Sequence, residues 1–230
     1  MEAKYRAVLM DADETIFDFA RAEAFALDET FRAFGLDPTP EALALYDLIN
    51  KELWRKFEKG EIAQAALKIR RFETLFSSLG VKAPAEAFSE AYIVNLGKGA
   101  FLLPGAEELC AYLAAKYPLV LVTNGIARVQ RPRFEASPVR RHFLGIVISE
   151  EAGAAKPAPK IFRKACEVLG PLAADPRDLI MVGDSLESDI AGAAAFGMDS
   201  CWVNLKGQPL GKGILPTYEV RSLEALREIL

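Results

Sequence analysis

The chain has 230 residues, 51% of them hydrophobic and 26% charged, and its formal net charge is −4 at pH 7. This composition predicts a folded protein with a sizeable core, and the mildly acidic balance argues against a partner such as a nucleic acid polymer. There is no apolar run near the ~20 residues of a membrane span, and the N-terminus lacks the apolar segment of a signal peptide. Three widely spaced cysteines in apolar contexts, Cys110, Cys166 and Cys201, predict buried thiols in a reducing cytoplasm.

The first predicted strand, Ala7–Met10, is a continuous apolar run of the kind that a buried parallel strand shows. It is followed by helical patterns rather than by a second strand. These predicted helices cover Asp18–Phe34, Glu41–Asn50, Lys51–Lys59, Ile62–Leu79 and Pro84–Leu96. This is far more chain than one crossover needs, so we expect a helical insertion, 17–98, in a core made of residues 1–16 and 99–230.

Beyond the insertion, apolar runs alternate with helical patterns. The predicted strands are Leu119–Val122, Gly145–Ile148, Asp178–Val182 and Ser200–Val203, and the predicted helices are Ala106–Lys116, Arg128–Glu135, Pro159–Leu169, Asp189–Phe196 and Leu223–Leu230. Such alternation predicts an α/β fold with a doubly wound parallel sheet. Right-handed crossovers place the carboxyl ends of all its strands at one edge.

Two carboxylates, Asp11 and Asp13, come directly after the first strand. Taken alone, this pattern is explained as well by a solvated turn. At the carboxyl end of a strand, however, open α/β sheets bind their ligands. Carboxylates this close repel each other unless a cation such as Mg²⁺ lies between them. One of them could then attack an electrophile while the other handles a proton.

Three further polar clusters follow later strands or loops. They are Thr123-Asn124-Gly125, then Lys156, then Asp184 with Asp189. Each has an ordinary explanation as a turn, a solvated lysine or a helix cap. Together they suit a metal-assisted phosphoryl site, because a hydroxyl and backbone amides bind phosphoryl oxygens, a lysine neutralises charge and a carboxylate binds the metal.

These segments, D-A-D-E-T, T-N-G, K-P and G-D-S-L-E-S-D, resemble the four motifs of the haloacid dehalogenase-like hydrolase superfamily. The resemblance spans the whole chain and implies a Rossmann-like core with a helical cap inserted after the first strand. Glu14 stands where most members have Gly, and this variant resembles the pyrimidine 5′-nucleotidase branch. The segments N-K-E-L-W (50–54), R-F-E (71–73) and C-W-V-N (201–204) also resemble that branch.

The resemblance implies a role for each motif residue. Asp11 would be the nucleophile that forms an aspartyl-phosphate, and Asp13 would protonate the leaving alkoxide and then activate water. The Asp11 carboxylate, the Asp13 backbone carbonyl and Asp184 would hold Mg²⁺, while Asp189 would bind a metal-bound water or orient Lys156. Asp13 also argues against dehalogenation, because a leaving halide needs no proton.

Substrate binding is assigned to two sets of residues. Thr123, Asn124, Gly125 and Lys156 would bind the phosphoryl group, with Thr123 and Lys156 counted as catalytic. In the insertion, Asn50 and Trp54 would contact the rest of the substrate, while most aromatic side chains there form the core of a helix bundle. Gln130 and Arg133 follow the second motif and could reach the substrate, but a solvated surface position is the favoured interpretation.

The resulting hypothesis is a Mg²⁺-dependent phosphomonoester hydrolase that is a monomer or homodimer. Its small-molecule substrate is a nucleoside 5′-monophosphate, with pyrimidine nucleotides preferred. An alternative within the superfamily is a phosphatase of another small ester, such as a sugar phosphate or phosphoglycolate. Outside it, a phospho-receiver signalling domain also places acids, a hydroxyl and a lysine on a parallel sheet, but without a helical insertion of this size. A binding protein without activity is the remaining alternative, and the intact acids argue against it.

Overall fold

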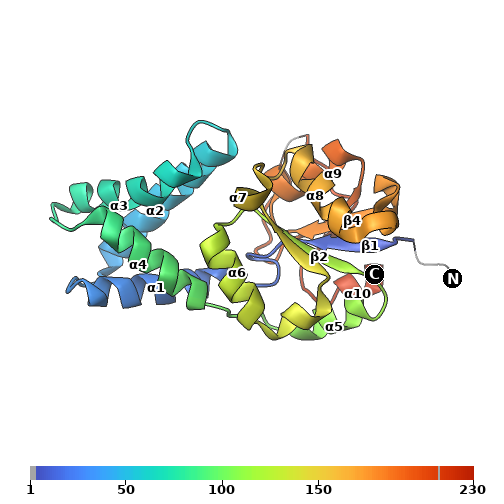
Figure 1. The fold of residues 1–230 in the computed structure, drawn as a ribbon, viewed down its shortest axis with the longest axis horizontal. Coiled ribbons are helices and arrows are strands. Elements are labelled where there is room, and N and C mark those ends of the chain that lie inside the picture. Colours follow the sequence, from blue (N-terminus) through green and yellow to red (C-terminus); the bar gives the residue numbers. More distant parts are fainter. Residues whose placement is uncertain (1–3, 212) are drawn as a thin grey trace. The chain divides into compact units, whose positions relative to one another are not determined.

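The computed structural model describes residues 4–211 and 213–230 of the chain (Figure 1). The chain divides into two compact units, one formed by Met1–Phe19 and Ala100–Leu230 and the other by Ala20–Gly99. The second unit occupies the part of the sequence where the helical insertion is predicted. Each unit has a core of its own and is described separately.

In the part of the first unit that the structure describes, six parallel strands form a single sheet in the order β3-β2-β1-β4-β5-β6. The strands are β1 (Ala7–Met10), β2 (Leu119–Thr123), β3 (Gly145–Ile148), β4 (Leu179–Gly183), β5 (Asp199–Val203) and β6 (Tyr218–Val220). The four residues of β1 are all apolar and buried, as an interior strand of a parallel sheet requires. This arrangement confirms the predicted doubly wound α/β fold.

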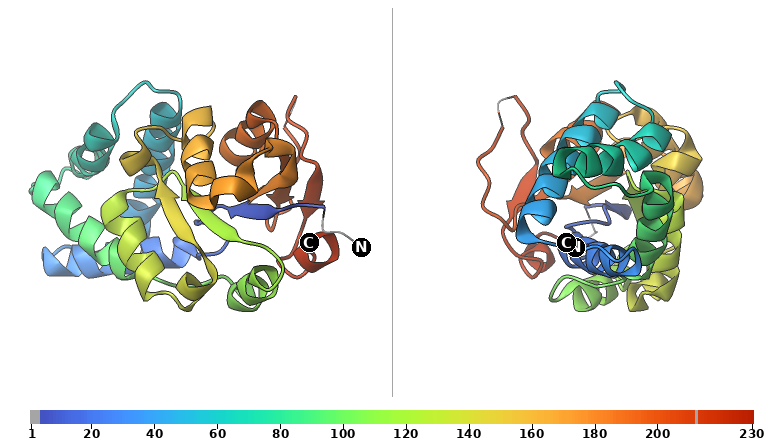
Figure 2. Two further views of the ribbon diagram at one scale, coloured as in Figure 1. Left: turned by 45° about the vertical axis from the view of Figure 1, so that its right-hand side comes forward. Right: turned by 90° about the vertical axis from the view of Figure 1, so that its left-hand side faces the viewer.

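Helices cover both faces of the sheet. They are α5 (Ala106–Ala114), α6 (Ala127–Ala136), α7 (Ser149–Ala152), α8 (Pro159–Leu169), α9 (Ala191–Phe196) and α10 (Leu226–Ile229). Because side chains alternate along a strand, Val8 and Met10 pack on the face covered by α5 and α10, whereas Ala7 and Leu9 pack on the face covered by α8 and α9. Figures 1 and 2 show β1, in blue, between these two helical layers.

Strand β6 was missed by the sequence analysis, which predicts five strands. It has three residues and lies at the edge of the sheet beside β5, and one of its side chains, Glu219, is exposed. A segment this short, covered on one side only, has too few positions to establish an alternating pattern. The sheet therefore extends one strand further than predicted.

The second unit is built from α1 (Phe19–Ala33), α2 (Pro40–Glu58), α3 (Gln64–Leu79) and α4 (Ala85–Lys98), the first of which begins in the other unit. The prediction of two helices between residues 41 and 59 is wrong, because α2 continues through Asn50. Asn50, the last residue of the first of these predicted helices, lies inside the unit, where it donates to Glu23 Oε1 at 3.0 Å. A buried polar residue with a partner does not end a helix.

Aromatic rings fill the core of the helical unit, as predicted. The Phe72 ring contacts those of Phe88 at 4.8 Å and Tyr46 at 5.5 Å between centroids, and Phe31 meets Phe88 edge-on at 5.1 Å. Offset and edge-to-face arrangements at these distances are the favoured ones. The unit is thus held together mainly by aromatic packing.

Among the described residues, none of the helices combines the length and the apolar character needed to cross a membrane.

Candidate active site

The candidate site lies at the carboxyl edge of the sheet. Asp11 follows β1, Thr123 is the last residue of β2, and Asp184 follows β4. Because β2, β1 and β4 are adjacent and parallel, these three residues end neighbouring strands at one edge. The Asp11 amide donates to the carbonyl of Val182 at 2.8 Å, so the ends of β1 and β4 are joined directly beside the site.

The side chain of Lys156 contacts acids from two of the other predicted motifs. This side chain is 1% exposed, and its ammonium donates to Asp11 Oδ1 and to the Val122 carbonyl at 2.8 Å. The ammonium also forms an ion pair with Asp189 Oδ1, which lies 2.7 Å away. Burial alone would lower the pKa of Lys156, but the carboxylates of Asp11 and Asp189 outweigh it and raise that pKa above its ordinary value. The lysine is therefore a fixed cation beside the carboxylate predicted to act as the nucleophile.

Asn124 fixes the position of this lysine. Its side-chain Oδ1 accepts from the Lys156 backbone N–H at 2.6 Å, and its Nδ2 donates to the Lys156 carbonyl at 2.8 Å. The two bonds use both polar atoms of the amide. The side chain of Asn124 thus holds the backbone of Lys156, and its predicted substrate contact applies to its backbone N–H alone.

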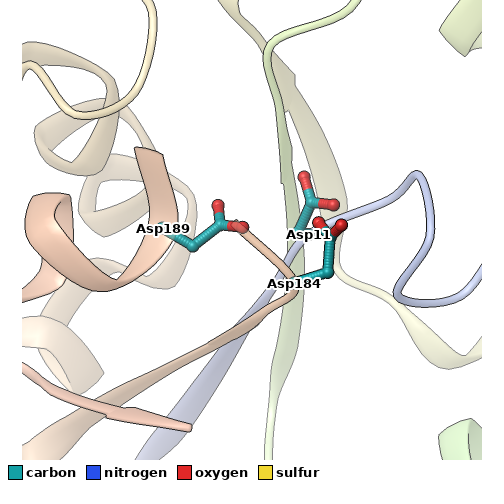
Figure 3. A group of neighbouring side chains, drawn as sticks. All are labelled: Asp11, Asp184 and Asp189. Carbon is teal, nitrogen blue, oxygen red and sulfur yellow. The ribbon is translucent and has the colours of Figure 1, made fainter. Parts of the chain in front are cut away.

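Three carboxylates, those of Asp11, Asp184 and Asp189, form a cluster in which one oxygen from each lies within 4.8 Å of the others (Figure 3). Burial raises the pKa of Asp11 to about 7 and that of Asp184 to about 8, and the neighbouring carboxylates add to the rise. Such a group of oxygen ligands, each costly to ionise beside the others, suits a hard divalent cation. The donor set therefore fits the predicted Mg²⁺.

Asp189 is held on both of its oxygens. Oδ1 pairs with Lys156, and Oδ2 accepts from the Ser185 backbone N–H at 3.1 Å. A short π-helical segment, Leu186–Ile190, carries this side chain back towards the strand end, and such segments are frequent at functional sites. A Cβ atom at Gly183 would lie 2.3 Å from Asp189 Oδ2, so only glycine at 183 leaves room for this carboxylate.

Asp13 points to a different set of partners from the other acids. Its Oδ2 accepts from Gln130 Nε2, and its Oδ1 accepts from Arg133 Nη1, each at 2.6 Å. The prediction of a solvated surface position for Gln130 and Arg133 is wrong, since they are 2% and 0% exposed. Periodicity could not reveal this, because their partner lies more than a hundred residues away in the sequence.

The sequence nevertheless contained a sign that Gln130 and Arg133 are buried. Val129 and Phe134 lie on the same buried face of α6 as Gln130 and Arg133. Polar residues that share a helical face with apolar ones are candidates for buried partners. Pro132 lies inside α6 without ending it.

Glu14, which stands where the resembled family has mostly glycine, adopts a positive φ of 61°. This conformation is uncommon for residues other than glycine. Its carboxylate lies 2.6 Å from Lys206 Nζ, in the segment after β5. Glu14 therefore ties the turn after β1 to that segment.

The two residues of the helical unit that are predicted to bind substrate contact different partners. Asn50 is buried and bonded to Glu23, and it also accepts from Arg71 at 3.4 Å. Trp54 is half-buried and packs edge-on against Phe57, with centroids 5.6 Å apart. Their contact with substrate stays a prediction.

Comparison with known proteins shows the family to which the chain is similar. A family model described as haloacid dehalogenase-like hydrolase matches residues 5–197. The chain is 36% identical to pyrimidine 5′-nucleotidase YjjG of Escherichia coli K12, over 99% of this chain and 98% of that protein. It is 30% identical to pyrimidine 5′-nucleotidase PynA of Streptococcus pneumoniae R6, over 98% and 95%.

A solved structure is also similar along its whole length. YfnB from Bacillus subtilis, crystallised bound to magnesium in a form that reveals interdomain movement, is 36% identical and superposes with a TM-score of 0.93, covering 99% of each chain. A likeness this complete includes the helical unit as well as the sheet. This chain and YfnB therefore share the same architecture.

Proposed function

Because the chain belongs to the haloacid dehalogenase-like hydrolase family and is a phosphatase, we propose that its substrates are nucleoside 5′-monophosphates, with pyrimidine nucleotides preferred. The observation that carries the phosphatase chemistry is the ammonium of Lys156, which contacts Asp11 and Asp189 beside the three-carboxylate cluster. Similarity to YjjG and PynA along nearly the whole chain supports the choice of nucleotide substrates. That similarity includes the helical unit as well as the sheet.

The residues of the site divide the reaction between them. A carboxylate oxygen of Asp11 attacks the phosphorus atom and forms a new P–O bond while the ester P–O bond breaks. The electron pair of the broken bond stays on the leaving alkoxide, which takes a proton from Asp13. Asp13 then removes a proton from water, which attacks the same phosphorus, releases phosphate and restores Asp11.

Charge neutralisation accompanies both steps. Lys156 is proposed to face the phosphoryl oxygens from beside Asp11, and the hydroxyl of Thr123 and the backbone amides of Asn124 and Gly125 are the proposed hydrogen-bond donors. Asp11, Asp184 and the backbone carbonyl of Asp13 would hold a Mg²⁺ ion, which would supply further positive charge at the phosphoryl group. Splitting the hydrolysis in two in this way replaces one difficult step by two easier ones.

The experiment is a metal-dependent phosphatase screen. Wild type is assayed with Mg²⁺ and with EDTA on 5′- and 3′-nucleotides of each base, several sugar phosphates, phosphoglycolate and 4-nitrophenyl phosphate. We expect the highest kcat/KM for 5′-UMP, 5′-CMP or 5′-dTMP, and no hydrolysis with EDTA. The Asp11→Asn variant, purified in the same way, measures any contaminating phosphatase and is expected to show background rates.

Each outcome has a distinct meaning. A higher kcat/KM on sugar phosphates or phosphoglycolate would refute the nucleotide proposal and leave the phosphatase chemistry in place. Comparable turnover by Asp11→Asn would remove the nucleophile. For Asn50 and Trp54, which we propose contact the nucleoside, substitution by Ala should lower kcat/KM for the preferred nucleotide more than for 4-nitrophenyl phosphate.

A further inference from the structure

A pair of side chains outside the predicted motifs holds the carboxylate of Asp13. Gln130 and Arg133, one helical turn apart on α6, each donate one hydrogen bond of 2.6 Å to a different oxygen of Asp13. The Asp13 side chain is 26% exposed, whereas the Arg133 side chain is wholly buried. The acid thus reaches the open side of the site while its supports lie inside the protein.

The surroundings of Arg133 leave it little freedom. Its guanidinium lies 4.8 Å from the centroid of the Phe17 ring and 5.9 Å from that of Phe19, within the range of cation–π contacts. The turn that carries both Asp13 and Phe17 is closed by the Glu14 N–H, which donates to the Phe17 carbonyl at 2.8 Å. Arg133 therefore makes two contacts with this compact turn, one with the Phe17 ring and one with the Asp13 carboxylate.

A buried guanidinium is unfavourable unless it is paired, because transfer of the charge out of water costs several kcal/mol. Arg133 Nη1 forms an ion pair with Asp13 Oδ1 at 2.6 Å. The pairing fixes the plane of the Asp13 carboxylate through two donors on its two oxygens. Each oxygen retains a lone pair for the proton that passes to the leaving group.

Gly125 supplies an independent sign that the position of Gln130 matters. A Cβ atom at Gly125 would lie 2.4 Å from Gln130 Cγ and 2.5 Å from its Nε2. Both distances are far inside van der Waals contact, so any larger residue at 125 would displace Gln130 from Asp13. The absence of a side chain at Gly125 thus leaves the space in which Gln130 reaches Asp13.

We propose that Gln130 and Arg133 are positioning residues that hold Asp13 in place for proton transfer, and that Gly125 provides the space that Gln130 needs. The proposal rests on the proposed phosphatase mechanism, in which Asp13 gives its proton to the leaving alkoxide. Precise orientation of a proton donor matters because a misplacement of about 1 Å can cost a factor of about 100 in rate.

The test compares two leaving groups. An alkyl phosphate such as 5′-UMP releases a basic alkoxide that needs a proton, whereas 4-nitrophenyl phosphate releases a stable phenolate that does not. We expect Arg133→Met and Gln130→Met to lower kcat/KM on the alkyl ester by about 100-fold, in the usual range for general acid catalysis. On the aryl ester, we expect a loss of less than about fivefold. The quantity kcat/KM is used because it reports the steps up to release of the leaving group.

Matched variants on the same helix separate positioning from folding. Arg131→Met also removes an arginine ion pair, since Arg131 bonds to Glu151, but this pair is on the surface with the Arg131 side chain 50% exposed. Arg131→Met should leave kcat/KM unchanged on both substrates. Arg133→Lys keeps the charge and should recover part of the loss on the alkyl ester. Circular dichroism and thermal unfolding establish that each variant is folded.

A double-mutant cycle tests the role of Gly125. Gly125→Ala should reduce kcat/KM on the alkyl ester in the wild-type background. It should reduce it much less in a Gln130→Ala background, where the side chain that it displaces is shortened. Additive effects of the two substitutions would refute the proposed link between Gly125 and Gln130.

The remaining outcomes separate this proposal from the proposed function. Equal losses on both esters in folded variants, or a faster alkyl reaction, would refute the positioning role alone. If another alkyl phosphate proves to be the better substrate, it replaces 5′-UMP in the same comparison. Failure of wild type to hydrolyse either ester with Mg²⁺ would refute the phosphatase mechanism and the positioning role with it.

Discussion

Replacement of Lys156 by methionine removes the ammonium that connects the motifs and keeps a similar side-chain volume. The lysine is 1% exposed, and Asp189, which pairs with it at 2.7 Å, is equally buried. Loss of one partner from a buried ion pair leaves the other charge uncompensated and costs about 3–5 kcal/mol. In a protein of this size, that corresponds to a fall in Tm of about 6–20 °C.

The fluorescence of Trp202 provides the assay. This side chain is 1% exposed in the sheet unit, and its Nε1 donates to the Asp184 carbonyl at 2.8 Å, so it reports unfolding beside the site. A Trp54→Phe background removes the other tryptophan of the chain. Urea unfolding of Lys156→Met is then measured in EDTA and in Mg²⁺.

Magnesium should recover part of the lost stability, because a cation among the carboxylates replaces the missing ammonium. It should not recover activity, which we expect to fall by about 10²–10³-fold through the loss of charge stabilisation at the phosphoryl group. Lys160→Met serves as a control, since Lys160 is an exposed residue of α8, and a change within about 0.5 kcal/mol is expected. A loss below about 1 kcal/mol for Lys156→Met in EDTA would refute the buried ion pair as a stabilising element.

Three more predictions concern other parts of the chain. In Gly183→Ala, the new Cβ would displace Asp189 and so misplace its partner Lys156. We expect kcat, measured by steady-state kinetics, to fall by at least about tenfold. Cys110 and Cys201 should resist a thiol reagent at pH 8 in the folded protein and react in urea, because burial raises the pKa of each thiol to about 12. Burial also raises the pKa of Glu23 above its ordinary value of 4.5, so the folded state retains a proton that the unfolded state loses. Relative to Glu23→Gln, wild type should therefore lose stability as the pH rises from about 4.5 through the raised pKa, as measured by urea unfolding at several pH values.

Each of these has a contrary outcome. Unchanged kinetics in Gly183→Ala would show that Asp189 can move without consequence. Rapid labelling of Cys110 or Cys201 in native protein would contradict their burial; Cys166, which is half-buried rather than buried as predicted, is the internal reference. A constant stability difference between wild type and Glu23→Gln across the pH range would contradict a shifted pKa at Glu23.

The strands of the sheet interior were predictable because burial on both faces makes their sequences continuously apolar. In β1, β2 and β4 every residue is buried, and each run ends at a polar residue that belongs to the site. The same logic failed for β6, whose position at the edge lets polar and apolar residues alternate over three positions only. The two helices predicted between residues 41 and 59 were also wrong, since α2 continues through the buried Asn50, whose partner Glu23 lies in another helix.

Some residues of the candidate site could likewise be predicted from the sequence, and others could not. The acids, the lysine and the T-N-G segment were found because each comes directly after an apolar run or within a short motif. Gln130 and Arg133 were placed on the wrong side of their helix, because the burial of a polar side chain depends on a partner from another part of the chain. Local patterns carry no information on such a partner, here Asp13 in the turn after β1.

The order of strands in the sheet has a consequence for the nascent chain. Asp11 is translated early, but Lys156, which contacts it, follows 145 positions later. The central strand, β1, must remain without its two lateral neighbours until both have been made, since β2 and β4 come from the later part of the chain. A ribosome-bound chain that stops before Lys156 should therefore be unable to hydrolyse a phosphate ester, and catalysis should begin only after β4 and Asp184 have also been made.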